Sequence, residues 1–312
     1  MRISCVLVVL SCVLPGAAWA QNEPQHTGLS TEKVTVTAPA EIPASVLHDF
    51  IKSYTAPSSP SGKIARWRHG ACPIATGLPP AGNKLVTDRI RQVAAMVGAP
   101  VGDANCKPNI DIVFTLNPQV LMDKVREKDR VLLGYHDAAQ EKTLATITHP
   151  VQAWYTTQTV DLNGTAYIDD KLRSHGGFYI QDPLNKGSSI YIPDARVAYV
   201  TGNHLDDGVS SELYHVIVVI DLAKINGLTL GALSDYAAIL SLARTEAFET
   251  CQPVASITNL LSGSCGAELR TGEISGSDLA YLHGLYSIDP RKSFLQQRDD
   301  IAYEMRKDVS RH

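Results

Sequence analysis

The feature that most restricts how this chain folds is its amino terminus, which has the pattern of an export signal. Arg2 gives a positive start, residues 3–14 are mostly apolar, and Ala18-Trp19-Ala20 matches a cleavage site of the A-x-A type. The apolar run is too short to cross about 30 Å of hydrocarbon, which argues against a membrane anchor. We therefore expect residues 1–20 to be a cleaved signal peptide and the mature protein to be periplasmic or secreted.

Export determines what the cysteines are expected to do, because disulfides form and persist in oxidising compartments. Two of the six cysteines lie in the signal peptide, and the other four are Cys72, Cys106, Cys251 and Cys265. Four cysteines allow three pairings. Proximity along the chain favours the disulfides Cys72–Cys106 and Cys251–Cys265. No C-x-x-C spacing occurs, so a zinc site built from cysteines is not expected.

Composition excludes several classes of protein. The chain has 312 residues, of which 44% are hydrophobic, and this is ample apolar material for a core. Lys and Arg number 28 against 32 Asp and Glu, which gives a formal net charge of −4 without a basic block. Binding to nucleic acid or to an anionic membrane needs clustered positive charge, so neither is expected. After the signal peptide no segment reaches 18 apolar residues, so no membrane insertion is expected either.

The periodicity of apolar residues predicts an α+β protein. Residues 21–42 are polar and expected to be loose, and residues 43–312 are expected to form a single domain with a possible internal boundary near 150. Helices are predicted over residues 43–54, 83–97, 117–133, 230–248, 275–285 and 293–309. Strands are predicted over residues 66–74, 110–116, 151–160, 177–180, 189–192, 197–201 and 213–222. Early alternating elements, a cluster of strands and a helical end together favour the α+β class.

Three signals late in the chain resemble a known family. The helix LGALSDYAAILSLARTE begins at Leu230, the turn Ala255-Ser256-Ile257-Thr258 follows, and the segment ISGSDLAYLHGLY begins at Ile274. Their order resembles the catalytic half of metzincin-type zinc peptidases, especially the matrixin-like ones. Those proteins have an H-E-x-x-H-x-x-G-x-x-H helix, an S-[IV]-M turn and a closing helix of the form L-S-x-x-D-[IL]-x-x-[IL]-x-x-L-Y. The chain is also similar to uncharacterised secreted proteobacterial proteins of that plan. The resemblance implies a zincin-like mixed sheet with an active-site-type helix.

The metal ligands of that family are missing from the corresponding positions. When the helix is aligned through its apolar pattern, Ser234, Ala238 and Arg244 stand where the family has its three histidines. Asp235 takes the place of the glutamate, and Thr258 takes the place of the methionine in the turn. Alanine has no lone pair for a metal, and arginine brings a permanent positive charge. The alignment therefore predicts no bound zinc and no other cofactor at this helix.

Two functions from different classes follow from these observations. The first is an exported binding or structural protein without catalytic activity, in which a peptidase-like cleft still holds a peptide or protein segment beside an edge strand. The second is a secreted hydrolase with an unrecognised site. His204, Asp206 and Asp207 are its candidates, because a histidine beside two carboxylates can perform acid–base chemistry or bind a metal. More often such a polar loop is a solvated turn. The sequence does not indicate an oligomeric state.

Overall fold

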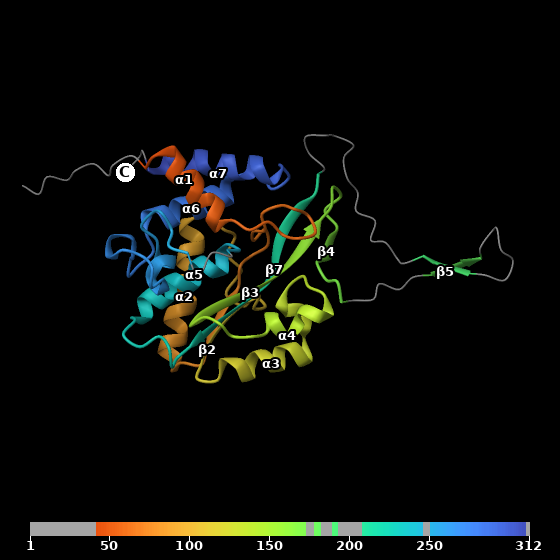
Figure 1. Cartoon of the computed structure of the whole chain (residues 1–312), viewed down its shortest axis with the longest axis horizontal. Helices are drawn as coiled ribbons and strands as arrows, with labels where there is room; N and C mark the ends of the chain where they lie inside the picture. The colour runs from red at the N-terminus through yellow and green to blue at the C-terminus, as the bar shows by residue number, and fades with distance from the viewer. Residues whose placement is uncertain (1–41, 173–177, 182–188, 193–207, 246–249, 310–312) are drawn as a thin grey trace, which may run out of the picture. The chain divides into compact units, whose positions relative to one another are not determined.

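The computed structural model describes residues 42–172, 178–181, 189–192, 208–245 and 250–309, and residues from Glu41 onward form one compact unit. The α-helices in chain order (Figure 1) are α1 (Ala44–Tyr54), α2 (Pro80–Met96), α3 (Pro118–Lys128), α4 (Glu141–Leu144), α5 (Leu230–Leu242), α6 (Gly276–Ser287) and α7 (Phe294–Val309). Four 3₁₀ turns accompany them, namely η1 (Arg130–Leu133), η2 (Ala138–Gln140), η3 (Ile257–Leu261) and η4 (Ala267–Leu269).

A mixed sheet of five strands lies at the centre, in the order β1-β2-β7-β3-β4. Its strands are β1 (Pro73–Thr76), β2 (Ile110–Thr115), β3 (Val151–Val160), β4 (Ala166–Ile168) and β7 (Ser210–Asp221). The strands β1, β2 and β7 are parallel, whereas β3 runs antiparallel to both β7 and β4. A separate antiparallel pair consists of β5 (Phe178–Gln181) and β6 (Ser189–Ile192). The predicted α+β class is confirmed.

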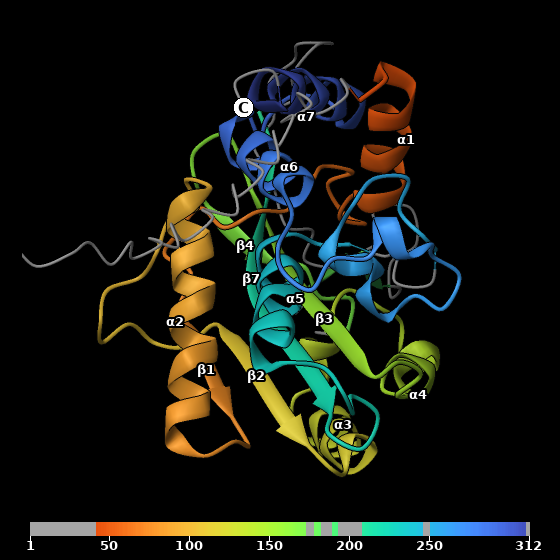
Figure 2. The ribbon, with the colours of Figure 1, turned by 90° about the vertical axis from the view of Figure 1, so that its left-hand side faces the viewer.

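The strand β7 lies in the middle of the sheet, and its apolar side chains point alternately into the cores on the two faces. Val218 and its alternate neighbours belong to the larger hydrophobic cluster, which also contains the buried faces of α2, α5 and α6. Ile217 and Val219 point the other way and pack with Met122 of α3 and Trp154 of β3. An almost continuous apolar strand is typical of a position buried on both faces. Figure 2 shows α2 and α5 in front of the sheet, with α3 below it.

The helix α5 begins and ends where side chains take up its terminal backbone groups. At the start, the Thr229 hydroxyl accepts a hydrogen bond from the amide of Ala232. At the end, the carbonyls of Ser241 and Leu242 accept hydrogen bonds of 2.7 Å from the Trp67 indole and the Tyr286 hydroxyl. The next residue, Ala243, is extended. The predicted helix over residues 230–248 is therefore too long, and residues 246–249 lie outside the described part of the chain.

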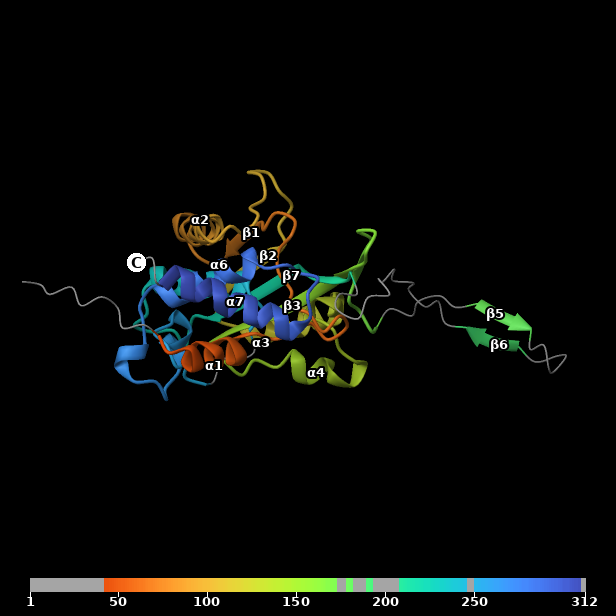
Figure 3. The same cartoon turned by 90° about the horizontal axis from the view of Figure 1, so that it is seen from above.

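Two further predictions of local structure were too long, and a third lies outside the described residues. The strand predicted over residues 66–74 forms regular pairing only at Pro73–Thr76, with single bridges at Arg66 and Ala71 before it. The helix predicted over residues 117–133 ends at Lys128 and continues as the 3₁₀ turn η1. Residues 197–201 are not among those described. Viewed from above, α2 lies toward the β1 edge and α4 toward the β3 edge (Figure 3).

Both predicted disulfides are present. Cys72 pairs with Cys106 across 34 residues, and Cys251 pairs with Cys265 across 14. The first joins the start of β1 to the segment before β2, and the second closes the loop around η3. The first disulfide therefore ties together the segments that lead into two neighbouring strands, and the second constrains a local loop.

Candidate functional site

The positions aligned with zinc ligands on α5 are mostly part of the core. Ser234 and Ala238 have no exposed surface, and the Ser234 hydroxyl donates to the Leu230 carbonyl one turn earlier. Thr258 is buried in η3, where its hydroxyl lies 2.8 Å from that of Ser256. These three residues line neither of the two cavities described below. Arg244 lies beyond the end of the helix, at a different place.

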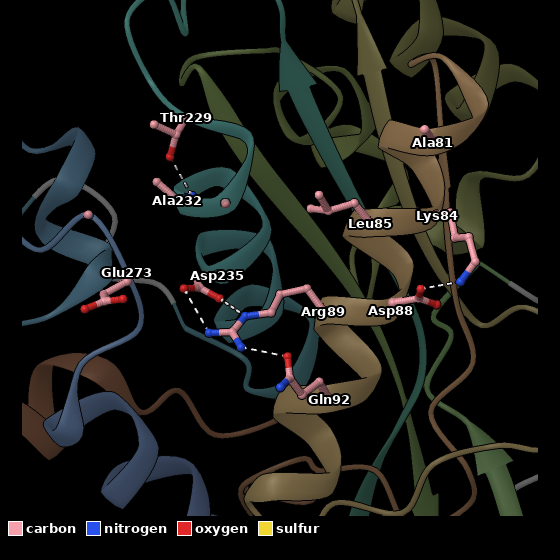
Figure 4. A pocket seen from close by; sticks show the side chains of 12 residues that line it. Ala81, Lys84, Leu85, Asp88, Arg89, Gln92, Thr229, Ala232, Asp235 and Glu273 are labelled. Carbon is pink, nitrogen blue, oxygen red and sulfur yellow. Dashed lines mark hydrogen bonds and ion pairs between the residues drawn. The ribbon is translucent and has the colours of Figure 1, made fainter. Parts of the chain in front are cut away.

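Asp235 is held in an ion pair that joins α5 to α2. Its carboxylate accepts hydrogen bonds of 2.5 and 3.2 Å from the Arg89 guanidinium and one of 2.9 Å from the Ile274 amide. A cavity of about 810 Å³ opens beside this pair (Figure 4). On its far wall Lys84 and Asp88 form another ion pair at 2.5 Å. The Arg89–Asp235 pair therefore holds α2 against α5, whereas the Lys84–Asp88 pair lies within α2.

The turn and the closing helix of the family-like pattern are linked through Asp278. Its buried carboxylate accepts hydrogen bonds from the Ser256 hydroxyl, the Ile257 amide and both the amide and hydroxyl of Ser275. Ser275 is the N-cap of α6 and forms a capping box with Asp278. Burial raises the pKa of Asp278, and the hydrogen bonds from Ile257, Ser256 and Ser275 oppose that rise. The aspartate of the closing motif therefore fixes η3 onto the start of α6.

The strand β3 has an edge that is only partly covered. The Asp221 amide bonds to the Pro150 carbonyl, so the even-numbered residues of β3 turn their backbone groups toward β7. The Asp169 amide bonds to the Thr157 carbonyl, and β4 continues this pairing as far as Val160. Among the described residues, no strand pairs with that side of β3 before Thr157. The odd-numbered residues at its start, including Val151 and Ala153, therefore turn their amides and carbonyls to an edge without a partner strand.

A groove of about 430 Å³ runs along this open edge. We call it the β3 groove. Residues from three segments line it: Leu133, Gly134 and Tyr135 after η1; Thr143, Leu144, Thr146 and Thr148 around α4; and Gln152, Ala153, Trp154, Tyr155, Thr157, Arg244 and Thr245. The backbone edge thus lies between a wall from the α4 segment and a wall from the residues after α5.

The α4 wall of the β3 groove is fixed by side chains of the strand itself. The Trp154 indole donates a hydrogen bond of 2.7 Å to the Leu144 carbonyl. The Gln152 side chain donates to the Thr146 carbonyl and accepts from the Thr148 amide. These hydrogen bonds hold the wall in place. They are made by the side chains of Gln152 and Trp154, so they do not occupy the backbone amides of β3.

The groove closes near Tyr155. At Gly134, where φ is +92°, an added Cβ would lie 2.6 Å from the Tyr155 carbonyl oxygen, so only glycine allows this approach. On the other wall, Arg244 is half-buried and donates a hydrogen bond of 3.1 Å to the Pro57 carbonyl. Burial raises the pKa of Tyr155, while the Thr245 backbone and the charge of Arg244 oppose the rise. The hydroxyl therefore stays protonated at neutral pH and lies within the influence of a cation.

The sequence-predicted candidates for hydrolysis, His204, Asp206 and Asp207, lie outside the described residues. Within the described ranges, no cluster of three or more His, Cys, Asp or Glu side chains has a geometry suited to a metal ion. Of the predicted site residues that the structure describes, only Arg244 lines the β3 groove. Alternation in the sequence predicts β3 as a strand, but Ala153, Trp154 and Tyr155 were not predicted as site residues. The signal available for them was an alternating strand rich in Thr and aromatic side chains.

Comparison of the chain with protein-family models, with curated proteins and with solved structures finds no match in any of the three. No helix among the described residues is long and apolar enough to cross a membrane.

Proposed function

We propose that this is an exported, non-catalytic binding protein that holds an extended peptide segment against the free edge of β3. The observation that carries the proposal is the β3 groove itself, which places between two fixed walls a stretch of backbone amides and carbonyls that no described strand pairs with. Added strands bind through main-chain hydrogen bonds, and the walls of such a groove select alternate side chains.

The zincin-like relationship is part of the same proposal. Three features support it: the helix that follows the central strand β7, the turn η3 that Asp278 holds against α6, and an open antiparallel strand beside β7. In this interpretation the cleft is retained, and core side chains such as Ser234 and Ala238 replace the metal ligands. Export is supported by the two disulfides, which are typical of oxidising compartments.

Selection from a phage library of random nonapeptides on the oxidised protein tests the proposed function. We expect enriched peptides to bind with an affinity that depends on the edge amide of Ala153. Ala153→Pro removes that amide, which faces away from β7, and is expected to weaken binding at least about tenfold. Ala153→Val is the matched control, because it retains the amide and is expected to bind like the wild type.

N-methylation of the peptide gives a second test that leaves the protein unchanged. An added strand bonds to β3 through alternate residues, so methylation of every second amide is expected to abolish binding while methylation of the others is tolerated. Failure to enrich any peptide, or a methylation pattern without alternation, would contradict strand addition. Stoichiometric zinc together with peptide cleavage by the same sample would contradict a non-catalytic role.

A further inference from the structure

The disulfide between Cys72 and Cys106 has a cation against one of its sulfurs. The guanidinium of Arg91 in α2 donates a hydrogen bond of 3.2 Å to the Cys106 Sγ. Cys106 is half-buried in a segment whose neighbouring residues 103–105, 107 and 108 are exposed, whereas Cys72 is buried. Cys106 is therefore partly accessible to solvent and in contact with a positive charge.

The Arg91 guanidinium is oriented by uncharged backbone groups. It donates hydrogen bonds of 2.8 Å to the Gly102 carbonyl and of 3.0 Å to the Asp103 carbonyl. An added Cβ at Gly102 would lie 2.7 Å from the Cys106 Sγ, so glycine allows the segment to fold tightly around that sulfur. The two carbonyls and the sulfur therefore form a fixed set of acceptors around one guanidinium.

The segment that leads to Cys106 is held in place by backbone hydrogen bonds as well as by the disulfide. The Ala71 amide donates to the Pro100 carbonyl at 2.8 Å, and the Gly102 amide donates to the Ala71 carbonyl at 3.0 Å. Because these bonds do not involve sulfur, we expect them to persist when the bond between the two sulfurs is broken. The Cys106 sulfur then stays beside Arg91.

The reduced state gains more from the Arg91 contact than the disulfide does. A neutral sulfur is a weak acceptor, whereas a hydrogen bond to a charged acceptor is about twice as strong as one between neutral groups. A neighbouring arginine favours the thiolate form of a cysteine. A disulfide whose reduced form is stabilised is the more easily reduced one. Arg91 therefore shifts the equilibrium between disulfide and dithiol toward the dithiol.

We propose that the Cys72–Cys106 disulfide is a reversible redox site, which low-molecular-weight thiols reduce and in which Arg91 binds the resulting Cys106 thiolate. The site lies before β1 and β2, so the inference does not depend on peptide binding by the β3 groove.

The reaction is a thiol–disulfide exchange that consumes two thiol molecules. The first attacks one protein sulfur as its thiolate, so a mixed disulfide forms as the Cys72–Cys106 bond breaks. The second attacks the sulfur of the first, releases the protein sulfur and leaves as a small disulfide. Two thiols are oxidised and one protein disulfide is reduced. Cys106 ends as a thiolate, Cys72 ends as a thiol, and one proton goes to the solvent.

Equilibration of the oxidised protein in glutathione redox buffers tests the inference. Free thiols are then alkylated, and the reduced fraction of each disulfide is measured by mass spectrometry of its peptides. Arg91→Gln is expected to lower the equilibrium constant for reduction of Cys72–Cys106 by glutathione about tenfold, which corresponds to about 30 mV for this two-electron couple. Arg91→Lys retains the positive charge and is expected to stay close to the wild type.

A merely structural role of Arg91 predicts a shift in the opposite direction. Without the contacts to Gly102 and Asp103 the segment would loosen, the two sulfurs would be held together less closely, and reduction would become easier. An equilibrium constant that is unchanged or higher in Arg91→Gln would overturn the inference, and so would an equal fall in Arg91→Lys.

Two controls accompany these measurements. The Cys251–Cys265 disulfide in the same samples reports whether a variant keeps its fold, and its equilibrium constant is expected to be the same in all variants. Lys84→Gln removes a positive charge from an exposed position of the same helix, and it is expected to leave the reduction of Cys72–Cys106 unchanged. A fall in Lys84→Gln as large as that in Arg91→Gln would show that net charge, rather than the Arg91 contact, controls the equilibrium, and the inference would be wrong.

Discussion

The ion pair between Arg89 and Asp235 allows a sharp test of whether Asp235 has a structural role. The side chain of Asp235 is 4% exposed, whereas that of Arg89 is 28% exposed. The charge left behind is therefore buried when Arg89 is replaced but partly accessible to water when Asp235 is replaced. An unpaired carboxylate would stay buried with the Ile274 amide as its remaining hydrogen-bond donor, whereas an unpaired guanidinium could reach water and Gln92.

This asymmetry gives an expected order of stabilities. Removing one partner of a buried ion pair costs about 3–5 kcal/mol when the other charge stays buried, so Arg89→Met is expected to destabilise by about 3 kcal/mol. Asp235→Asn retains an acceptor for the Ile274 amide and leaves the Arg89 guanidinium accessible to water. It is therefore expected to lower the free energy of unfolding by about 1–2 kcal/mol. The double variant is expected to be more stable than Arg89→Met alone, because the second substitution removes the isolated buried charge.

Urea unfolding followed by tryptophan fluorescence measures these differences. Trp67 and Trp154 are both buried, and they report on the two sides of the sheet. Lys84→Met is the control on the same helix, since the Lys84–Asp88 pair is exposed and its loss is expected to cost at most about 0.5 kcal/mol. Two results would refute a structural role for this ion pair. One is a double variant whose loss of unfolding free energy is the sum of the two single losses, and the other is a larger loss for Asp235→Asn than for Arg89→Met.

Three further predictions concern the edge, the cap and the disulfides. Hydrogen exchange followed by NMR is expected to show a fast amide at Ala153 beside a protected one at Trp154; equal protection would mean that the edge is covered. Burial raises the pKa of Asp278, so its favourable contribution is full below the unfolded pKa of about 3.9 and is lost as the pH rises through the folded pKa. The stability of the wild type relative to Asp278→Asn should therefore fall from acidic to neutral pH in urea titrations, and a rise would contradict this. Removing Cys72–Cys106, which closes 34 residues, is expected to cost about 3.8 kcal/mol in thermal or urea unfolding, against about 3.0 kcal/mol for the 14-residue loop; the reverse order would exclude loop closure as the main cause.

Local patterns in the sequence were sufficient for most of the fold. The run from Leu213 to Leu222 is apolar at nearly every position, and such a strand has few places to lie except the middle of a sheet. The helix predicted over residues 275–285, with Ser275 or Ser277 as its cap, is α6, which begins at Gly276 directly after its N-cap Ser275. The disulfides followed from proximity alone. In each case the residues that decide the structure are close together in the chain.

The predictions were inaccurate where distant residues decide the outcome. The ten residues after Leu242, 243–252, contain no Gly or Pro, yet α5 ends at Leu242, where Trp67 and Tyr286 donate hydrogen bonds to its last carbonyls. The β3 groove could not be predicted from the sequence for the same reason. Alternation predicts that residues 151–160 form a strand, but which edge stays open depends on β4 and on the close approach of Gly134. Among the described residues that line the groove, only Arg244 had been predicted as a site residue, from the family resemblance.

The order of strands in the sheet has a consequence for how the chain acquires its structure. The strand β7 is the last of the five in the sequence, yet it separates β2 from β3 in the sheet. Before Ser210–Asp221 is available, neither neighbour has its partner, and both present bare strand edges. Contacts of such long sequence separation slow folding. A chain interrupted before β7 is complete would be a substrate for chaperones and prone to aggregation. The central sheet can therefore form only once the polypeptide is complete as far as Asp221.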